Sequence, residues 1–523
     1  MTSKLINIGM IPAKHAALNP TRDAVIDVAS GRRVNFRELD ERVRRVANGL
    51  CRDLGLERGD RVAVLSRNCV EFQEIYFAAG RAGLITQPLN WRLSAPELET
   101  IVRDASPRVL VYAEEFRDTA EELMRRVDFP HWLNIEEGGG GSYAEMLAAA
   151  SDDEPADSIH VGGDDPFMIL YTGGTTGESK GVLHSHMSVY MGMLNQTVGE
   201  RIVPTDVYML TGQMFHIPVV LAMNYLAHGC PLVLINFEAK LALDVIQAEG
   251  VSAFLGITTM LNWMMAEETF ATYDLSSLRN IQYGGGPMPP AVVRAALDAF
   301  PCTLVQGYGQ TEGTTMTFLS QEDHINAVRG VEPQRLSSCG RECFATSVRI
   351  LDAEGNPVAK DGKTPGEIVV RSPANMLGYW GNPELTAKTI RDGWMWTGDI
   401  ATFDADGYVY IVDRAKDMII SGGENIYSVQ VEEAIHNHPA VLEAAVIGVP
   451  DDEWGESVKA FVVLKPGTTA TDQEIIDTAR EYLASYQKPR SVEFVASLPK
   501  GITGKIMKRE LREPYWRTSD REV

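Results

Sequence analysis

A loop rich in glycine and threonine, which follows a short apolar run, decides how this sequence is interpreted. The stretch reads Phe167-Met168-Ile169-Leu170-Tyr171-Thr172-Gly173-Gly174-Thr175-Thr176-Gly177-Glu178-Ser179-Lys180-Gly181. The apolar run predicts a buried strand. In the loop, glycines let backbone N–H groups converge on an anion, threonine hydroxyls add donors, and Lys180 adds positive charge. We therefore expect a polyphosphate-binding loop; a flexible hairpin connection is the alternative if the loop is taken alone.

This loop differs from the Walker A loop of P-loop nucleotide triphosphatases. A Walker A loop needs Gly before its Lys and Ser or Thr after it, whereas Lys180 stands between Ser179 and Gly181. Residues 181–184 have the pattern of a second strand, where a Walker A loop continues into a helix. The sequence therefore predicts a strand on each side of the loop.

Composition and charge exclude several classes of protein. At about 150 residues per domain, 523 residues allow roughly three or four domain-sized units. Lys and Arg number 48 against 71 Asp and Glu, a net charge of −23 that repels phosphate backbones and anionic lipid, so no nucleic-acid partner is expected. Six cysteines indicate free thiols in a reducing compartment. Because Gly9, Pro12 and Lys14 rule out a secretory signal, we expect a cytoplasmic protein.

The longest uncharged run, residues 207–237, is long enough to raise the question of a membrane span. Polar residues, glycine and proline interrupt it, among them Gln213, Pro218, Asn224 and Gly229. A buried helix near residues 218–227, a turn and a buried strand at 232–236 fit the run better. We therefore expect no transmembrane segment.

The remaining pattern predicts a layered α/β fold with a small second domain. From residue 165 to about 300, short β-rich runs alternate with helical ones. The composition shifts after Asp413, and the roughly 110 residues beyond it have their own strands, at 442–449 and 458–464, and helices, at 429–437 and 471–484. Thr471 and Glu474 form a capping box for the last helix. The expected domains are residues 1–413 and 414–523.

Five motifs, in this order along the chain, resemble those of the adenylate-forming superfamily, which contains acyl-CoA synthetases, nonribosomal-peptide adenylation domains and firefly luciferase. They are the loop at 171–181, Tyr308-Gly309-Gln310-Thr311-Glu312, Trp396-Thr397-Gly398-Asp399, Asp413-Arg414-Ala415-Lys416-Asp417 and Gly501-Ile502-Thr503-Gly504-Lys505. The resemblance covers essentially the whole chain. Two loop positions depart from the family pattern, since Gly173 stands where Ser is commoner and Ser179 where Pro is commoner.

The resemblance implies an ATP site built from several motifs. It assigns the phosphates to Thr172, Gly173, Gly174, Thr175, Thr176, Gly177 and Lys180. It places adenine against Gly284, Gly285, Gly286, Pro287, Tyr308 and Gly309, and the ribose hydroxyls against Asp399 and Arg414. A structural salt bridge is the alternative for Asp399 and Arg414, and a turn that ends a strand is the alternative for residues 284–287.

Joining a carboxylate to ATP brings two anions together at the α-phosphorus, so positive charge must converge there. The resemblance implies that Lys505 bridges the carboxylate and the α-phosphate. It makes Glu312 the ligand of Mg²⁺, an ion that prefers carboxylate and phosphate oxygens, and gives Thr311 a phosphate contact. His216 is the fourth candidate catalytic residue. Outside this family context, Lys505 would be a solvated lysine and Glu312 an ordinary surface glutamate.

The acid is expected to be hydrophobic: long-chain, alicyclic or aromatic. Residues 215–222 correspond to the run before the acyl pocket, where amino-acid-activating relatives carry an aspartate, and here they hold no carboxylate. We expect an apolar wall in the pocket that binds the acid, formed by the uncharged residues 215–226 together with residues 257–261 and 284–286.

The C-terminal residues are expected to bind coenzyme A. Trp454, Tyr486 and Lys488 resemble the patch with which aryl-acyl-CoA ligases hold the CoA nucleotide, and aromatic stacking with a cation suits a phosphorylated adenine. Ordinary packing is the alternative for each. Gly422 and Gly423 are expected to line the approach of the thiol, and Lys416 to be the pivot of a small mobile α+β lid domain.

The resemblance therefore implies an AMP-forming acyl-CoA synthetase that uses a small-molecule carboxylic acid, ATP, Mg²⁺ and coenzyme A. An acyl-AMP ligase that loads a carrier protein and a catalytically inactive nucleotide-binding paralogue are the alternatives, and a luciferase would share the first half-reaction. No metal site is expected at Cys339, Cys343, His184 and His186, because the sequence lacks the further ligands that a zinc site needs at suitable spacing. We expect these residues to be structural. The sequence leaves open homodimerisation and the identity of the acid.

Overall fold

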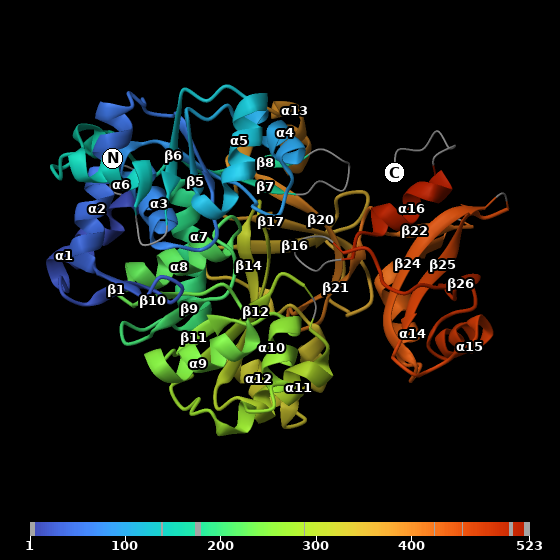
Figure 1. The fold of residues 1–523 in the computed structure, drawn as a ribbon. Coiled ribbons are helices and arrows are strands. Elements are labelled where there is room, and N and C mark those ends of the chain that lie inside the picture. The colour runs from blue at the N-terminus through green and yellow to red at the C-terminus, as the bar shows by residue number, and fades with distance from the viewer. Residues whose placement is uncertain are drawn as a thin grey trace. The chain divides into compact units, whose positions relative to one another are not determined.

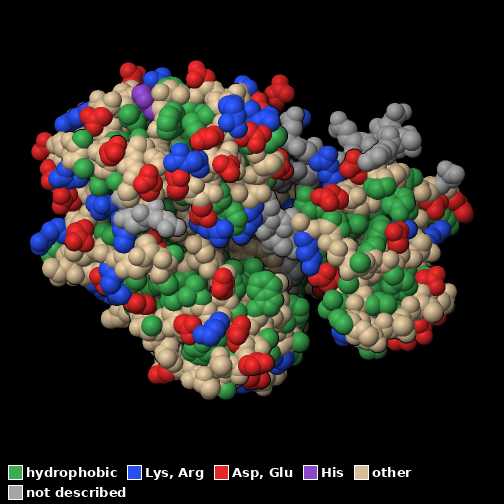
Figure 2. Space-filling model, in the orientation of Figure 1, with side chains coloured by type: hydrophobic (Ala, Val, Ile, Leu, Met, Phe, Trp, Pro, Cys, Tyr) green, Lys and Arg blue, Asp and Glu red, His purple; other side chains and the backbone are tan. Residues whose placement is uncertain are grey.

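The computed structural model describes residues 6–136, 140–172, 179–286, 288–422, 424–451, 453–500 and 506–516. These residues form two compact units, coloured along the chain in Figure 1. The first unit contains most residues up to Val348 together with Val370–Met395, and the second contains Arg349–Val369 and most residues from Trp396 onward. Acidic and basic side chains are interspersed on the face of the first unit shown in Figure 2.

A seven-stranded sheet in the first unit carries the ends of the predicted phosphate loop. Its order is β18-β8-β7-β4-β3-β5-β6, with β3 (Arg61–Leu65), β4 (Ile85–Pro88), β5 (Val109–Ala113), β6 (His131–Ile135), β7 (Pro166–Thr172), β8 (Lys180–Ser185) and β18 (Gly378–Tyr379). The accompanying helices are α2 (Phe36–Asn48), α3 (Val70–Ala82), α4 (Ala95–Ala105), α5 (Arg117–Arg126) and α6 (Gly141–Ala149). Strands β7 and β8 are antiparallel and pair Thr172 with Lys180, which confirms the two predicted strands around the loop.

A nine-stranded sheet completes the first unit, in the order β15-β14-β13-β12-β11-β9-β10-β1-β2. The strands are β1 (Asp23–Asp27), β2 (Arg32–Asn35), β9 (Tyr208–Leu210), β10 (Leu232–Leu234), β11 (Ala253–Leu255), β12 (Asn280–Gly284), β13 (Thr303–Gln310), β14 (Thr314–Leu319) and β15 (Arg341–Glu342). The helices are α1 (Ile11–Leu18), α7 (His186–Glu200), α8 (Pro218–Ala227), α9 (Ala239–Glu249), α10 (Thr258–Met265), α11 (Pro290–Ala299) and α12 (Gln321–Val328). The strands from β1 through β13 in this order run parallel to one another.

Helix α8 and strand β10 confirm the interpretation of the uncharged run as buried structure. All side chains of α8 from Val219 to Leu226 are buried, in one apolar core with residues such as Phe72 and Tyr76. Burial on every side explains why this run carries no charge. The helices that the structure describes include none with the length and apolar character that crossing a bilayer requires.

A five-stranded sheet precedes the C-terminal part of the chain. It has the order β16-β17-β20-β19, with β21 paired to β20. Its strands are β16 (Ser347–Leu351), β17 (Gly366–Arg371), β19 (Ile390–Arg391), β20 (Trp394–Phe403) and β21 (Val409–Arg414), and helix α13 (Pro383–Thr389) lies before β19 in the chain.

The C-terminal part is the predicted small α+β domain. Its sheet has the order β23-β22-β25-β24, with β26 paired to β25. The elements are β22 (Ile419–Ser421), β23 (Glu424–Ile426), α14 (Ser428–His436), β24 (Val441–Asp451), β25 (Gly455–Leu464), α15 (Asp472–Tyr482), β26 (Ser491–Phe494) and α16 (Lys508–Trp516). Alternation along β24 places Val446 in the core with α14 and α15, and Ile447 in a second cluster with Leu511 of α16. The predicted capping box of Thr471 and Glu474 is present.

Candidate active site

One edge of the nine-stranded sheet gathers several predicted site residues. Because β9, β11, β12 and β13 are parallel neighbours, their carboxyl ends meet at the same edge, where ligands of α/β sheets usually bind. His216 follows β9, Gly285 follows β12, and Thr311 with Glu312 follows β13. The hydroxyl of Thr211 donates to the Leu255 carbonyl at 2.5 Å, which ties neighbouring strand ends together.

Two glycines in these strands are required because the backbone approaches too closely for any side chain. A Cβ atom on Gly284 would lie 2.3 Å from the carbonyl oxygen of Gly307 in β13. At the β-bulge after Tyr308, a Cβ atom on Gly309 would lie 1.8 Å from the carbonyl oxygen of Thr314. Beside Gly286, in contrast, no atom of the described residues, apart from its chain neighbours, lies within 4 Å of such a Cβ, so space is open at the end of β12.

The turn of Thr311 and Glu312 is held by a histidine of strand β8. The Nε2 atom of His184, in β8, lies 2.7 Å from the Thr311 carbonyl oxygen, and Nδ1 lies 3.0 Å from the Ser188 hydroxyl. A carbonyl only accepts, so Nε2 carries the proton. Burial lowers the pKa of His184 to about 4, so the ring is neutral at pH 7. His184 thus contacts the main chain of a motif residue.

Tyr379 connects two charged residues of the predicted site. Its hydroxyl donates to Glu312 Oε1 at 2.9 Å, and Lys180 Nζ lies 5.7 Å from the centre of its ring. The three side chains come from β18, β8 and the end of β13. Sequence reasoning missed Tyr379, because a tyrosine 67 residues from Glu312 carries no local signal of this contact.

Several of the predicted site residues lie outside the described residues. This applies to Gly173, Gly174, Thr175, Thr176, Gly177, Pro287, Gly423 and Lys505. Thr172 and Lys180, at the two ends of the loop, are described and paired across β7 and β8. Tyr308 is buried in β13, with 9% of its surface exposed.

The run before the predicted acyl pocket contacts residues that sequence reasoning did not select. The ring of His216 lies 4.6 Å from that of Phe215, at a tilt of 55°. The guanidinium of Arg92 lies 5.8 Å from the Phe215 ring and 4.5 Å from the Trp91 ring. The apolar run therefore has a cation beside it. Helix α8 is buried in the core from Val219 onward. Of the expected apolar wall of the acid pocket at 215–226, only the residues just before that helix therefore remain candidates.

Asp399 and Arg414, the predicted ribose contacts, face each other across β20 and β21. Arg414 Nε lies 3.2 Å from Asp399 Oδ1, so the structural salt bridge considered above is present. The Asp399 side chain is 6% exposed and that of Arg414 is 42% exposed. A guanidinium has five N–H donors, and one ion pair occupies only part of them.

Two of the predicted coenzyme A contacts lie against each other in the C-terminal part. Gly422 donates its N–H to the Trp454 carbonyl at 2.8 Å, and its φ of +61° suits glycine. A Cβ atom there would lie 2.6 Å from the Trp454 ring. The Arg490 guanidinium stacks on this ring at 4.9 Å and adds a cation that the sequence did not indicate. Tyr486 is 46% exposed, in the segment between α15 and β26 that also contains Lys488.

The side chains that could coordinate a metal fit Mg²⁺ better than a metal ion that is coordinated by protein side chains alone. No group of three or more His, Cys, Asp and Glu side chains that could hold a metal occurs among the described residues. Glu312 offers a carboxylate at this sheet edge, and Mg²⁺ commonly takes one or two carboxylates and completes its shell with water and substrate phosphates. Glu312 therefore fits a Mg²⁺ ion that arrives with ATP.

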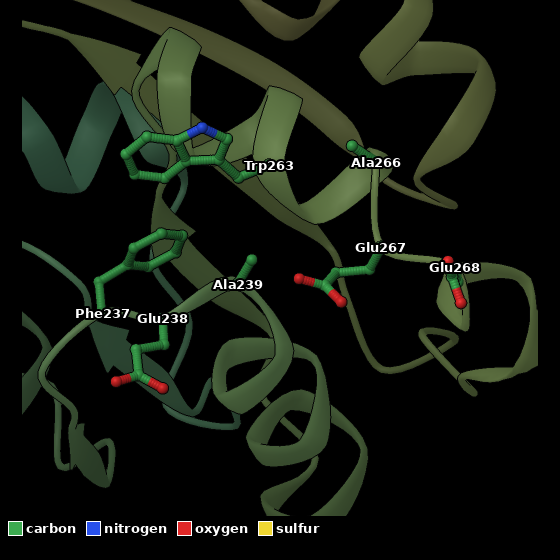
Figure 3. A pocket seen from close by; sticks show the side chains of 7 residues that line it. All are labelled: Phe237, Glu238, Ala239, Trp263, Ala266, Glu267 and Glu268. Atoms are coloured by element: carbon green, nitrogen blue, oxygen red, sulfur yellow. The ribbon is translucent and has the colours of Figure 1, made fainter.

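A surface cavity of about 680 Å³ elsewhere on the first unit contains none of the predicted site residues (Figure 3). It lies between the start of α9 and the end of α10, where Phe237 and Trp263 stack at 6.5 Å. Glu238, Glu267 and Glu268 line it as well. Three carboxylates would repel ATP and a substrate carboxylate, so this cavity is not the active site.

Comparison with known proteins shows the family of the chain. The family model of AMP-binding enzymes matches residues 13–380, and that of the AMP-binding enzyme C-terminal domain matches residues 430–505. The chain therefore belongs to the AMP-binding enzyme family, in the acyl-CoA synthetase branch of the adenylate-forming superfamily. This membership confirms the predicted fold class and makes the chain an AMP-forming acid–thiol ligase.

Individual relatives match over almost their whole length. A feruloyl-CoA synthase of an Amycolatopsis species is 37% identical over 511 residues, which cover 97% of this chain and 99% of that protein. The long-chain-fatty-acid–CoA ligase FadD13 of Mycobacterium tuberculosis is 34% identical, with 97% and 98% covered. The fatty acid–acyl-carrier-protein ligase ScoC of Streptomyces coeruleorubidus is 33% identical, with 97% and 96% covered. ATP-bound MatB from Rhodopseudomonas palustris superimposes with a TM-score of 0.87 at 29% identity, with 98% and 99% covered.

Proposed function

We propose that this enzyme activates a hydrophobic carboxylic acid with ATP and transfers the acyl group to coenzyme A. In the first half-reaction a carboxylate oxygen attacks the α-phosphorus, and pyrophosphate leaves. In the second, the CoA thiol attacks the acyl carbon, a thioester forms, and AMP and a proton leave. The observation that carries the proposal is the convergence of Lys180, Tyr379 and Glu312 at the end of the predicted phosphate loop.

The phosphates are assigned to Thr172, Lys180 and the loop between them. Glu312 would hold Mg²⁺, which would supply positive charge to the phosphates, and Thr311 would donate its hydroxyl to a phosphate oxygen. Lys505 would neutralise the charge that builds up as the carboxylate meets the α-phosphate. Each of these groups stabilises charge more strongly in the transition state than in the ground state, which is what accelerates the reaction.

Adenine is assigned to the open end of β12 and to Tyr308, and the ribose hydroxyls to Asp399 and Arg414. Residues 1–413 form the proposed nucleotide- and acid-binding domain, and residues 414–523 the lid, with its pivot at Lys416. The proposed coenzyme A contacts are Gly422, Gly423, Trp454, Tyr486 and Lys488. The geometry adds Arg490, whose guanidinium next to the Trp454 ring suits a nucleotide phosphate.

A hydrophobic, non-amino acid is the proposed substrate class. Residues 215–222 supply no carboxylate to pair with a substrate ammonium, and the Arg92 guanidinium beside Phe215 would repel one. The relatives named for feruloyl and long-chain fatty acyl substrates support large apolar acids. His216, next to Phe215, is the proposed catalytic residue on the acyl side.

Transfer to a carrier protein is the second candidate for the final step. The 33% identity to ScoC, named as a ligase that uses an acyl-carrier protein, favours it. The first half-reaction would be the same. The coenzyme A patch around Trp454 is the feature that favours the free cofactor.

Pyrophosphate release with a panel of acids tests the proposal. We expect octanoate, benzoate and cyclohexanecarboxylate to give a higher kcat/KM than acetate or an α-amino acid, and Glu312→Gln to abolish most of the release with each acid. If acetate or an amino acid is the best substrate, the proposed pocket is wrong. If no acid in the panel releases pyrophosphate, an inactive nucleotide-binding protein becomes the better account.

A further inference from the structure

We propose that Tyr379 is a positioning residue that sets the orientation of Glu312 for its metal ion and of Lys180 for the ATP phosphates. This inference rests on the proposed function. It assigns two separate tasks to one side chain, because the hydroxyl contacts the carboxylate and the ring contacts the ammonium.

The backbone around Tyr379 is fixed firmly enough for such a role. β18 pairs Tyr379 with Val182 of β8, the strand that begins at Lys180. On either side, Leu377 donates its N–H to the Leu183 carbonyl at 2.8 Å, and Trp380 donates to the Gly181 carbonyl at 2.7 Å. The Tyr379 N–H donates to the Thr386 hydroxyl at 2.9 Å. The ring therefore extends from a strand edge that is bonded on both sides to the strand of Lys180.

The hydroxyl can orient the carboxylate without competing for the metal. An ionised carboxylate has two oxygens with about four acceptor positions, and the phenol occupies one of them, on Oε1. A phenol has an ordinary pKa of about 10, so the Tyr379 hydroxyl is a protonated donor at neutral pH. The Glu312 backbone carbonyl is also fixed, since it accepts from the Met376 N–H at 2.7 Å. Main chain and side chain of Glu312 are thus both held by the segment around Tyr379.

The ring acts on Lys180 by a different interaction. An ammonium within about 6 Å of an aromatic centroid is attracted by the negative face of the ring. Lys180 Nζ, at 5.7 Å from the Tyr379 centroid, meets this condition. Since the cation–π contact needs the ring but not the hydroxyl, the two tasks can be separated by substitution.

The test is equilibrium binding of ATP, measured by titration calorimetry in the absence of the acid, with Mg²⁺ and with EDTA. The dissociation constant in EDTA divided by that in Mg²⁺ is a ratio that reports the metal-dependent part of ATP affinity. Tyr379→Phe removes only the hydroxyl, and we expect it to reduce this ratio about tenfold, the loss typical of one hydrogen bond to a charged group, while binding in EDTA changes less than about twofold. Tyr379→Leu removes the ring as well and should weaken binding under both conditions.

Tyr273→Phe is the matched control. Tyr273 also donates its hydroxyl to a carboxylate, Asp244, at 2.7 Å, but none of the predicted site residues is in this pair. The control should leave the ratio unchanged. Combining Tyr379→Phe with Glu312→Gln should cost no more metal-dependent affinity than Glu312→Gln alone, because both act through one carboxylate.

Three results would overturn the inference: an unchanged ratio in Tyr379→Phe, an equal loss in Tyr273→Phe, or full additivity with Glu312→Gln. Thermal unfolding of each variant identifies any that fail to fold. If Tyr379→Leu fails, Tyr379→Phe, which removes only the hydroxyl, decides. A wild-type enzyme that binds ATP equally with Mg²⁺ and EDTA would overturn both the proposed function and this inference. A wild-type ratio above one with an unchanged variant would overturn the inference alone.

Discussion

Arg512 of α16 is bonded to the main chain of Lys416. Its guanidinium donates to the Lys416 carbonyl at 3.2 Å and to Asp417 Oδ1 at 2.9 Å. Both acceptor atoms come after the φ and ψ bonds of Lys416 in the chain. Rotation about these bonds therefore moves both acceptors together with the residues that follow. If Lys416 is the pivot of the lid, the body that turns therefore begins immediately after it and includes α16. A hinge of this kind needs only a few residues that change φ and ψ.

Separation of the two half-reactions is the first prediction. Lys505→Ala should slow acyl-AMP formation by about 10²–10³-fold, the typical loss for one group that stabilises transition-state charge, yet still convert supplied acyl-AMP and CoA to thioester. Lys416→Pro, which fixes φ, should retain adenylation and lose thioester formation. Single-turnover kinetics of each half-reaction checks both.

A control on folding is needed for the pivot variant. Asp417 donates its N–H to the Arg414 carbonyl at 2.9 Å, so Lys416 is the third residue of a turn, where proline is disfavoured. Thermal unfolding should show that the variant is folded. If both folded variants lose both half-reactions in similar proportion, the pivot account is contradicted.

The coenzyme A patch gives the second prediction. Trp454→Ala combined with Lys488→Ala should raise the apparent KM for CoA about tenfold or more, because stacking on the nucleotide base and a phosphate contact are both lost. Acid-dependent pyrophosphate release should change less than about twofold. Tyr482→Ala removes another exposed aromatic ring of the same domain and should leave both values unchanged. Equal damage to both half-reactions would show that the patch does not bind CoA.

Local pattern in the sequence predicted the strands beside the phosphate loop, the buried helix α8 and the small C-terminal domain. Those predictions succeeded because each depends on neighbours in the chain. The contact of Tyr379 with Glu312 and the stacking of Arg490 on Trp454 could not be predicted in this way. They join residues that are distant in sequence, and the order of strands in a sheet, which brings them together, is not encoded in hydrophobic periodicity. Tyrosine in a strand most often indicates packing.

The third prediction concerns the pH dependence of stability through Glu200. This residue is fully buried at the end of α7, and Tyr225 donates its hydroxyl to Oε2 at 3.0 Å. Burial raises its pKa to about 8 from 4.5. Its contribution to stability is complete below pH 4.5, and it is lost as the pH rises toward 8, by about 1.4 kcal/mol per unit, because only the unfolded state then releases the proton.

The glutamine of Glu200→Gln is uncharged in both the folded and the unfolded state, so the stability of this variant does not fall with pH in this way. The difference in Tm between the variant and the wild type should therefore shift in favour of the variant between pH 5 and pH 8, by several degrees. Glu268→Gln, at an exposed position, provides the control and should show no such shift. A Glu200→Gln difference that is the same at both pH values would contradict the assignment of a neutral buried carboxyl.

The fourth prediction concerns the glycine at the β-bulge. Gly309→Ala would place a methyl group 1.8 Å from the Thr314 carbonyl oxygen, so the strands must separate. Such overpacking typically costs about 1–3 kcal/mol, and the adjacent Thr311 and Glu312 would move with the strand. We expect a lower Tm and a loss of adenylation. Gly286→Ala, where space is open, should keep the wild-type Tm; an equal Tm for both variants would contradict the close approach.

The most direct test of the central claim follows the acyl group itself. The enzyme is first incubated with ATP, Mg²⁺ and the best acid, so that acyl-AMP accumulates, and then mixed with free CoA or with a pantetheinylated carrier protein. We predict that one acyl-CoA and one AMP form for each acyl-AMP consumed, and that the carrier reacts much more slowly. Rapid transfer to the carrier with little reaction of free CoA would contradict the account.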